Sequence, residues 1–370
     1  MLKTNSQGEI ISSSLFNVRL KVALTFNVKP ESESFHQELP PISKNTQLQP
    51  EKCIDTYAEW DTWETINALK SALEINHEVI LIEANEFAPE KFREAKPDIV
   101  FNFAEGLKGI SREAQIPAIL DMLGIPYTGS DPLTLATCLD KSRTKEILTY
   151  HKIPNPKFIL ADSFDSIKNH RLKFPLIVKP ISEGSSKGIF SSSFVQNENE
   201  LENEINRVLS EYDQSALVEE FLPGREFTVG VLGNGPEAIA LPVVEINYQE
   251  FPEDFVPIYS YEAKWILDTK ENPLDVFTCP ANVSEELESQ IKEIVLNAYK
   301  TLRCKDWSRI DVRLDENNIP NIIEVNPIPG ILPDPNDNSC FPKAARTYGL
   351  NYEELVNQVL YVAAKRHNIV

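Results

Sequence analysis

The chain has 370 residues, of which 42% are hydrophobic and 25% are charged. These values are typical of a globular protein, and the length allows two or three domains. The formal net charge of −20 at pH 7 argues against nucleic acid or an anionic membrane as a partner. A site for a polyanion such as a nucleotide must therefore gather its own cations.

Cysteine usage and the N-terminal sequence favour a cytoplasmic protein. The five cysteines, Cys53, Cys138, Cys279, Cys304 and Cys340, are widely spaced and form no CxxC pair. This pattern argues against a disulfide framework or a zinc site and for a reducing compartment. The opening MLKTNSQGEI lacks the basic and apolar segments of a signal peptide. We expect no membrane span, because no apolar run approaches the required length of about 18 residues.

The first third of the chain is predicted to alternate strands and helices. Residues 1–17 are polar and are expected to be frayed, and residues 28–57 contain four prolines among polar residues, which favours a long mobile loop. Apolar runs predict strands over 18–26, 79–82 and 99–103, and helical spacing predicts helices over 60–73 and 114–123. This alternation indicates a parallel α/β sheet in a first domain that covers residues 18–130.

Two further units follow along the chain. The second, over residues 131–216, is expected to contain helices at 140–150 and 198–210 and strands at 158–160 and 176–179. The third, over residues 217–370, is expected to contain strands at 227–232, 239–246, 310–314 and 322–325 and helices at 285–302 and 352–365. The sequence thus predicts an α/β protein with three domains.

The stretch PLIVKPISEGSSKGI combines a short apolar strand with a loop suited to an anion. The strand ends in Lys179, and in the loop Gly184 and Gly188 bracket Ser185 and Ser186. Glycines let backbone N–H groups approach a phosphate closely, and serines add hydroxyl donors. The stretch therefore predicts a phosphate-binding loop, although taken alone it is equally compatible with a surface turn beside a solvated lysine.

The stretch RIDVRLDENNIPNIIEVNP predicts a hairpin that carries acids. If Leu314 pairs with Asn321, simple antiparallel register places Asp311 opposite Glu324, and Asn326 shares a face with Glu324. Two carboxylates and an amide oxygen suit Mg²⁺ or Mn²⁺ that also takes oxygens from a substrate phosphate. The alternative is a solvent-facing hairpin whose acids pair with its own arginines. We favour the metal site, because facing like charges are costly without a cation between them.

Two further stretches are weaker signals. In LVEEFLPGREFTVGVLG, acids end one strand before a Pro–Gly turn, and Glu226 enters the next strand. Such a strand end could bind an adenine edge and ribose hydroxyls, or its acids could simply solubilise a turn. In YSYEAKW, Lys264 lies among aromatic residues, which fits either a mobile lid or a packed aromatic cluster with a snorkelling lysine.

The order and spacing of these pieces resemble the ATP-grasp superfamily and, within it, the D-alanine–D-alanine ligase family. The resemblance runs from about residue 99 almost to the C-terminus through FNFAEG, GIPYTGSDPLTLATCLDK, IVKPISEGSSKG, VEEFLPGREFTV, YEAKW, RIDVRLD and EVNPIPG. It implies an ATP-grasp fold, in which ATP is held between the central and C-terminal domains beneath a flap of Ser and Gly residues.

The resemblance also implies roles for residues in these motifs. Those directed toward the nucleotide are Lys141 and Lys179 at the phosphates, Ser185 and Ser186 in the flap, Glu219, Phe221 and Leu222 at the adenine, and Glu226 at the ribose. Those directed toward the transferred phosphate are Lys264 at the γ-phosphate, Asp311, Glu324 and Asn326 as ligands of Mg²⁺, and Arg309 with the backbone N–H of Gly330 at the charge that develops on the acyl phosphate.

Departures from the family pattern converge on the pocket for the acyl substrate. Glu59 is similar in position to the acid that binds the first substrate's ammonium, but its surroundings, YAEWDTWET, have changed. Glu105 stands where the family has a histidine, and a carboxylate there would repel a substrate carboxylate. Arg112 and Glu113 fill a stretch where the family has acids, so Arg112 could offset Glu105 if the two pair.

The pocket for the second substrate has changed as well. The segment after Gly330 is longer than in the family, and its His–Ser–Leu is replaced by Asn338, Ser339 and Cys340. Ser339 could still hold a substrate carboxylate. Neutral drift in loops is the alternative explanation of these changes. We favour a changed acyl substrate and expect free D-alanine to be a poor acyl donor.

Three functions remain open from the sequence. The first is an ATP- and Mg²⁺-dependent ligase that phosphorylates a carboxylate, or a comparable oxygen, and joins it to an amino acid, with the D-alanyl-D-alanine dipeptide as the family's default product. The second is a ligase that joins an amino acid to a non-peptide acceptor, such as mycosporine-glycine in mycosporine-like amino acid biosynthesis. The third is an ATP-binding module without turnover. The expected partners are ATP and amino-acid-like small molecules, with a homodimer as the family precedent.

Overall fold

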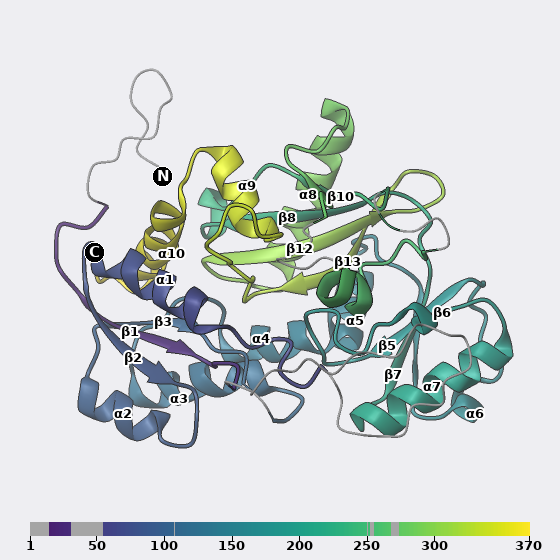
Figure 1. Cartoon of the computed structure of the whole chain (residues 1–370), viewed down its shortest axis with the longest axis horizontal. Helices are drawn as coiled ribbons and strands as arrows, with labels where there is room; N and C mark the ends of the chain where they lie inside the picture. Colours follow the sequence, from purple (N-terminus) through teal and green to yellow (C-terminus); the bar gives the residue numbers. More distant parts are fainter. Residues whose placement is uncertain (1–14, 31–54, 107, 250, 252–254, 268–273) are drawn as a thin grey trace.

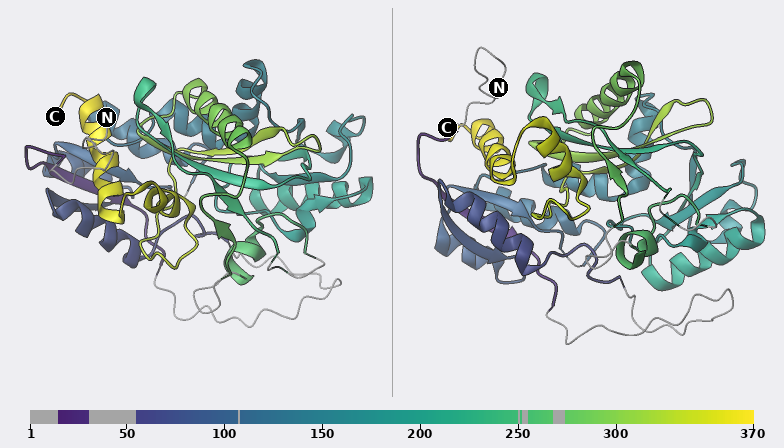
Figure 2. Two further views of the ribbon diagram at one scale, coloured as in Figure 1. Left: turned by 90° about the horizontal axis from the view of Figure 1, so that it is seen from above. Right: turned by 45° about the horizontal axis from the view of Figure 1, so that its top comes forward.

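The computed structural model describes residues 15–30, 55–106, 108–249, 251, 255–267 and 274–370 (Figures 1 and 2). Our expectations for residues 1–14 and for most of the loop 28–57 fall outside these ranges. The frayed N-terminus was expected to reach residue 17, which is wrong for Phe16. Its side chain is 5% exposed, and its ring packs edge-on against His77 and Tyr361 at centroid distances of 4.4 and 5.7 Å.

The N-terminal unit is a parallel sheet covered by helices, as the alternating pattern predicted. Strands β1 (Lys21–Phe26), β2 (Glu78–Glu83) and β3 (Ile99–Phe103) lie in the order β2-β1-β3. Helices α1 (Trp63–Glu74), α2 (Ala88–Ala95) and α3 (Gln115–Leu123) pack around them. The sequence did not predict α2, because it buries only Ala88 and Phe92 and so shows too little apolar periodicity.

The central unit is an antiparallel sheet at the opposite end of the molecule (Figure 1). Strands β4 (Phe158–Ala161), β5 (Leu176–Pro180), β6 (Phe194–Val195) and β7 (Ala216–Glu220) lie in the order β4-β7-β5-β6. Helices α6 (Phe164–Ile167) and α7 (Glu198–Tyr212) pack on this sheet. Because β7 pairs with β4 and β5, it does not open the third unit as expected. The division into domains stays a proposal, with its second boundary better placed at the turn around Gly224.

Two helices lead from the N-terminal unit into the central sheet. Helix α4 (Pro132–Leu139), which we did not predict, is capped by Asp131, whose carboxylate accepts from the N–H of Thr134 at 3.0 Å. Helix α5 (Lys141–Tyr150) is capped by Asp140, which accepts from the first-turn N–H groups. The caps fix where each helix begins and therefore place the side chain of the first residue of α5, Lys141.

The C-terminal unit is a larger antiparallel sheet with helices on both faces (Figure 2). Strands β8 (Glu226–Leu232), β10 (Val244–Ile246), β11 (Phe277–Thr278), β12 (Trp307–Leu314) and β13 (Pro320–Asn326) lie in the order β11-β10-β8-β12-β13, and β9 (Ile239–Ala240) also pairs with β8. Helix α8 (Glu285–Thr301) covers one face, and α9 (Cys340–Tyr348) packs against the other. The single strand expected over 239–246 is interrupted near Pro242, which has no N–H to donate to a ladder.

The N-terminal and C-terminal units share one apolar core. Helix α10 (Tyr352–Arg366) lies against α1, and the Asn357 side chain donates to the carbonyl of Ala72 at 2.8 Å. The buried ring of Trp307 packs edge-on against Phe101 and Phe341. This packing holds the end of β12 against the N-terminal sheet, so residues from all three units can face one space.

Within the described residues, no helix is long and apolar enough to cross a membrane. The four cysteines there, Cys138, Cys279, Cys304 and Cys340, carry free thiols, while Cys53 falls outside these ranges.

Candidate active site

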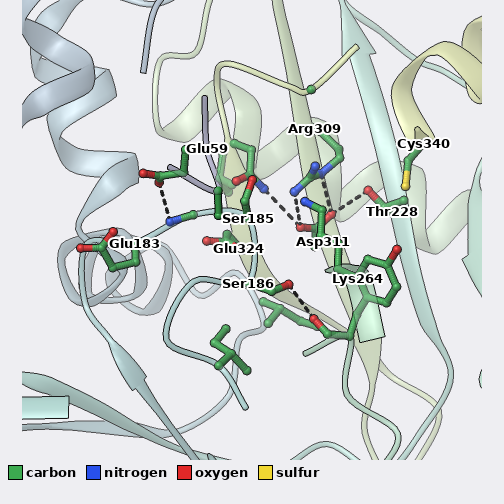
Figure 3. Close-up of a pocket in the computed structure, with 18 of the residues that line it drawn as sticks. Glu59, Glu183, Ser185, Ser186, Thr228, Lys264, Arg309, Asp311, Glu324 and Cys340 are labelled. Carbon is green, nitrogen blue, oxygen red and sulfur yellow. Dashed lines mark hydrogen bonds and ion pairs between the residues drawn. The ribbon is translucent and has the colours of Figure 1, made fainter. Parts of the chain in front are cut away.

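A cavity of about 350 Å³ lies where the three units meet. Every residue that we assigned to the site lines this cavity, except Arg112. Figure 3 shows its centre, where Lys264, Arg309, Asp311 and Glu324 face the flap serines. Residues separated by more than 250 positions in the chain are therefore brought to one place.

The acid-bearing hairpin has the facing pair that we predicted but a different register at its turn. Leu314 pairs with Pro320 and not with Asn321 as expected. An irregularity after Asp311 then inserts one residue into β13, so Asp311 still faces Glu324. The prediction was right at the site because a β-bulge compensates for a turn that is one residue shorter than we assumed.

Asp311 lies at the centre of a hydrogen-bond network on the sheet. Its Oδ1 accepts from the Thr228 hydroxyl at 2.6 Å and from Nε of Arg309 at 3.1 Å. Its Oδ2 accepts from Nη2 of Arg309 at 3.1 Å and from the amide of Asn326 at 3.2 Å. The network fixes the direction of the carboxylate and holds the guanidinium of Arg309 at the cavity (Figure 3). Sequence reasoning missed Thr228, because a threonine inside a strand carries no distinctive signal.

Lys141 connects the start of α5 to the hairpin. Its ammonium nitrogen lies 2.6 Å from Oε1 of Glu324, and it also donates to the carbonyl of Glu183 in the flap. Burial favours the neutral acid, but Lys141 and Lys179 outweigh it and hold the pKa of Glu324 below its usual range. Glu324 is therefore an anion that already sits among the cations expected at the phosphates.

Lys179 and Glu219 form part of a buried group of three charges. Lys179 bonds one oxygen of Glu219, and Lys145 lies 2.8 Å from the other. Although burial alone would raise the pKa of Glu219, the two ammonium groups hold it at about 2. The sequence held one unused clue to Lys145: it follows Lys141 by four residues and so lies on the same helix face.

The flap is held closed by contacts with the segment that carries Lys264. The Ser186 hydroxyl donates to the carbonyl of Tyr259 at 2.7 Å, and the indole N–H of Trp265 donates to the carbonyl of Ser185 at 3.2 Å. Both serines have left-handed φ angles, 51° and 60°, a backbone conformation that ordinary residues rarely adopt. We noted no anchor for the flap from the sequence, because these partners lie more than 70 residues away.

Lys264 is a cation with a lowered pKa. It lies on a short π-helical turn, Ala263–Leu267, and lines the cavity. Burial, and then the nearby positive charge of Arg309, lower the pKa of Lys264 to about 8. Its ammonium lies 5.1 Å from the centre of the Trp265 ring, a cation–π contact within the same turn. The YEAKW segment thus lines the cavity with Lys264 and Trp265, and its role as a mobile lid stays a prediction.

The end of the cavity assigned to adenine and ribose is lined by Phe221, Leu222 and Glu226. The Phe221 N–H is already used by the carbonyl of Pro175. Glu226 accepts from the Tyr248 hydroxyl at 2.8 Å and from Arg313 at 2.7 Å. The guanidinium of Arg313 also lies 4.6 Å from the centre of the Phe221 ring. A residue that the sequence left unassigned, Arg313, therefore positions both neighbours.

On the N-terminal side, Arg112 lies behind the wall and holds two acids. Its Nη2 lies 2.6 and 2.8 Å from the two oxygens of Glu59 and 3.2 Å from Glu183, and its Nη1 donates to the carbonyl of Ser182. The Gly184 N–H also donates to Glu59 at 2.7 Å (Figure 3). Glu59 is thus a link between the N-terminal unit and the flap.

Glu105 differs from our expectation in two ways. Among the described residues no ion pair joins it to Arg112, so the pairing that we considered is wrong, although the Arg112 guanidinium still opposes the rise of the Glu105 pKa. Burial and the neighbouring carboxyls of Glu113, Glu59 and Asp61 raise the pKa of Glu105 well above its usual range. A protonated carboxyl does not repel a carboxylate, so this rise argues against the repulsion that we gave as the reason against D-alanine. The expectation about D-alanine itself stays a prediction.

The segment near the second-substrate pocket places Ser339 and Cys340 at the start of α9. The Ser339 hydroxyl accepts from the Leu332 N–H at 3.1 Å and contacts the carbonyl of Gly330 at 3.3 Å. Burial raises the pKa of the Cys340 thiol to about 12, so this group packs against the site as a thiol and not as a nucleophile. The hydroxyl of Ser339 holds the long segment after Gly330 in place.

Comparison with known protein families identifies the chain. Residues 147–361 match the family model described as the D-Ala–D-Ala ligase C-terminus. The chain belongs to the D-alanine–D-alanine ligase family. The resemblance that we inferred from the motifs is thereby confirmed. Family members share the ATP-grasp fold, so the α/β class that we predicted is confirmed as well.

Similar proteins align along most of the chain. An uncharacterised protein of Sinorhizobium fredii, y4sG, is 33% identical over 318 residues, which cover 83% of this chain and 90% of that protein. The D-alanine–D-alanine ligase of Pelotomaculum thermopropionicum is 31% identical over 317 residues, which cover 83% and 93%. The structure of the Bacillus anthracis ligase complexed with ATP matches 95% of this chain and 99% of that chain with a TM-score of 0.66 at 21% identity.

Proposed function

We propose that the chain is an ATP- and Mg²⁺-dependent ligase of the D-alanine–D-alanine ligase type. An oxygen of a substrate carboxylate, or a comparable oxygen, attacks the γ-phosphorus of ATP, the bond to the β-phosphate oxygen breaks, and ADP leaves. The amine of an amino acid then attacks the acyl carbon, the bond to the phosphate oxygen breaks, and phosphate leaves as the nitrogen gives up a proton. The product contains a new carbon–nitrogen bond.

The observation that carries this proposal is the convergence of four cations on one cavity. Lys141, Lys179, Lys264 and Arg309 come from four different elements and all line it. Phosphoryl transfer to a carboxylate brings two anions together, so preorganised positive charge supplies much of the catalysis. In a chain with a net charge of −20, such a gathering of cations at one cavity favours an anionic ligand.

The facing carboxylates fit a divalent metal that binds together with ATP. Asp311, Glu324 and Asn326 offer oxygen ligands, but the set is too small to complete a six-ligand shell by itself. Mg²⁺ commonly binds one or two carboxylates and takes its remaining oxygens from substrate phosphates and water. When bound, it would supply further neutralisation of the phosphate charge, while Arg309 orients Asp311 and Lys141 orients Glu324.

A phosphate-release assay tests this function. The full chain is incubated with ATP, Mg²⁺ and a panel of amino acids of both configurations, singly and in pairs, and the products are analysed by mass spectrometry. We expect phosphate release that needs both substrates and stops when EDTA removes the metal. ATP binding without phosphate release in any combination would support the alternative, a module that binds ATP without turnover.

The acyl substrate, location and assembly remain proposals of narrower scope. A non-peptide acceptor, such as mycosporine-glycine, belongs in the same panel, because the acyl pocket differs from the family pattern. We also propose a cytoplasmic location and a homodimer. Light scattering of the purified chain tests the dimer directly.

A further inference from the structure

The carboxylate expected to hold the first substrate's ammonium is already occupied. Both oxygens of Glu59 accept from Nη2 of Arg112, at 2.6 and 2.8 Å, and Oε1 also accepts from the Gly184 N–H at 2.7 Å. The side chain of Arg112 is only 4% exposed, so water does not weaken this ion pair. A cationic ligand would have to displace a buried arginine to bind Glu59.

Two other carboxyl groups face the same end of the cavity without a partner. Glu113 is 8% exposed and lines the cavity, yet it makes no hydrogen bond or ion pair with any residue that the structure describes. Glu105 lines the same wall and likewise has no such partner there. Buried polar groups normally have partners, so the unpartnered Glu113, beside a partly exposed and likewise unpartnered Glu105, indicates a group kept for a ligand.

The electrostatics of the pair support this interpretation. Burial and the nearby carboxylate of Glu59 raise the pKa of Glu113 to about 8, although Arg112 and Lys141 oppose the shift. Burial and then Glu113 raise the pKa of Glu105. In both cases burial favours the protonated carboxyl in the free protein, and the nearby cations oppose this only in part.

We propose that Glu105 and Glu113 bind a positively charged nitrogen of the substrate whose carboxylate is activated. The inference rests on the proposed function for the identity of that substrate. Glu113 also interacts electrostatically with Lys141 and Glu324, so its carboxyl lies near the centre of phosphate transfer. A small molecule with its cation at Glu113 can present its carboxylate to that centre. The charged nitrogen is either the α-ammonium of an amino acid or a distal amine.

Matched ligand pairs distinguish these two sources. Alanine and lactate differ in the α-ammonium, while lysine and norleucine differ in the distal amine. We would titrate each compound, in both configurations, into the full chain in a calorimeter. We expect the wild-type chain to bind the cationic member of at least one pair at least tenfold more tightly, which corresponds to about 1.4 kcal/mol. Equal binding within both pairs overturns the proposal.

Isosteric variants assign the preference to these residues. Glu113→Gln and Glu105→Gln remove the ionisable groups with little change in shape, and each should reduce the preference to below about threefold. Glu245→Gln is the matched control, because Glu245 pairs with Arg225 outside the cavity and its loss changes the net charge by the same amount. A preference that survives in both site variants overturns the proposal. If Glu113→Gln fails to fold, Glu105→Gln alone decides.

Phosphate release separates failure of this inference from failure of the proposed function. Release with the uncharged member of a pair at the same kcat/KM as with the cationic member would overturn the cation site and keep the ligase. A binding preference that the variants abolish, without phosphate release in any combination, would support the cation site and refute carboxylate activation.

Discussion

Replacing Lys145 with methionine should destabilise the protein through the buried charge group. Lys145 is about 1% exposed and lies 2.8 Å from Glu219, which also bonds Lys179. Removal of one partner from a buried ion pair typically costs about 3–5 kcal/mol, because the remaining charge loses its compensation. Since Lys179 stays in place, we expect the lower end, about 3 kcal/mol.

That loss translates into a measurable change in melting temperature. With an unfolding entropy of about 2 cal/mol/K per residue, a chain of 370 residues has roughly 0.8 kcal/mol/K, so Tm should fall by roughly 4 °C. Differential scanning calorimetry at pH 7 measures the shift. Lys168→Met is the matched control, because Lys168 is 67% exposed and faces Asp165 across 3.6 Å, so its loss should change the free energy of unfolding by at most about 1 kcal/mol.

The pH dependence of stability provides a second test of the ion pair between Lys145 and Glu219. The depressed pKa of Glu219, about 2, contributes stability that is fully present above the ordinary value near 4.5 and is lost as the pH falls toward 2. In Lys145→Met the pKa of Glu219 should rise, so less of this contribution remains to be lost. The difference in Tm between the wild type and the variant should therefore narrow between pH 5 and pH 3. Equal shifts for Lys145→Met and Lys168→Met at pH 7 would refute the reasoning.

Three further predictions concern catalysis. Glu324→Ala should lower turnover by more than roughly hundredfold, the scale for loss of one preorganised electrostatic group, while circular dichroism shows a folded chain; wild-type rates at millimolar Mg²⁺ would contradict the metal assignment. Hydrogen exchange over residues 181–188 should slow when a non-hydrolysable ATP analogue binds, because phosphates give the flap N–H groups new partners, and unchanged exchange with bound analogue would rule out a flap. The rate should fall as the pH rises through about 8, where Lys264 loses its charge; Lys264→Arg should remove this fall, since arginine stays protonated.

Several features of the fold could be predicted from the sequence because they depend on local patterns. The strands of the parallel sheet are short apolar runs, and α10 shows helical periodicity over fifteen residues. Helix α2 was missed because a helix that buries two residues has almost no apolar period. The split of the strand at Pro242 was missed because the apolar residues around it continue the pattern of a strand.

The membership of β7 and the register of the hairpin depended on tertiary pairing. The sequence of β7 is compatible with either sheet. Only its hydrogen bonds to β4 and β5 show that it belongs to the central sheet. The facing of Asp311 and Glu324 survived a wrong turn assignment because a bulge restored the register. The sequence predicted that Asp311 faces Glu324, but it did not predict the β-bulge next to this pair.

The sequence by itself determined the family, the fold class and most of the residues that line the cavity, because these lie in short motifs whose order along the chain is specific. Only the tertiary structure decided the state of the acids at the other end of the cavity. It showed that Arg112 holds Glu59 and Glu183 instead of Glu105, and that Glu105 and the buried Glu113 line one cavity and interact electrostatically. The physical reason is that the charge of a carboxyl group depends on its burial and on its neighbours within a few ångströms, and those neighbours come from segments that the linear sequence does not place side by side.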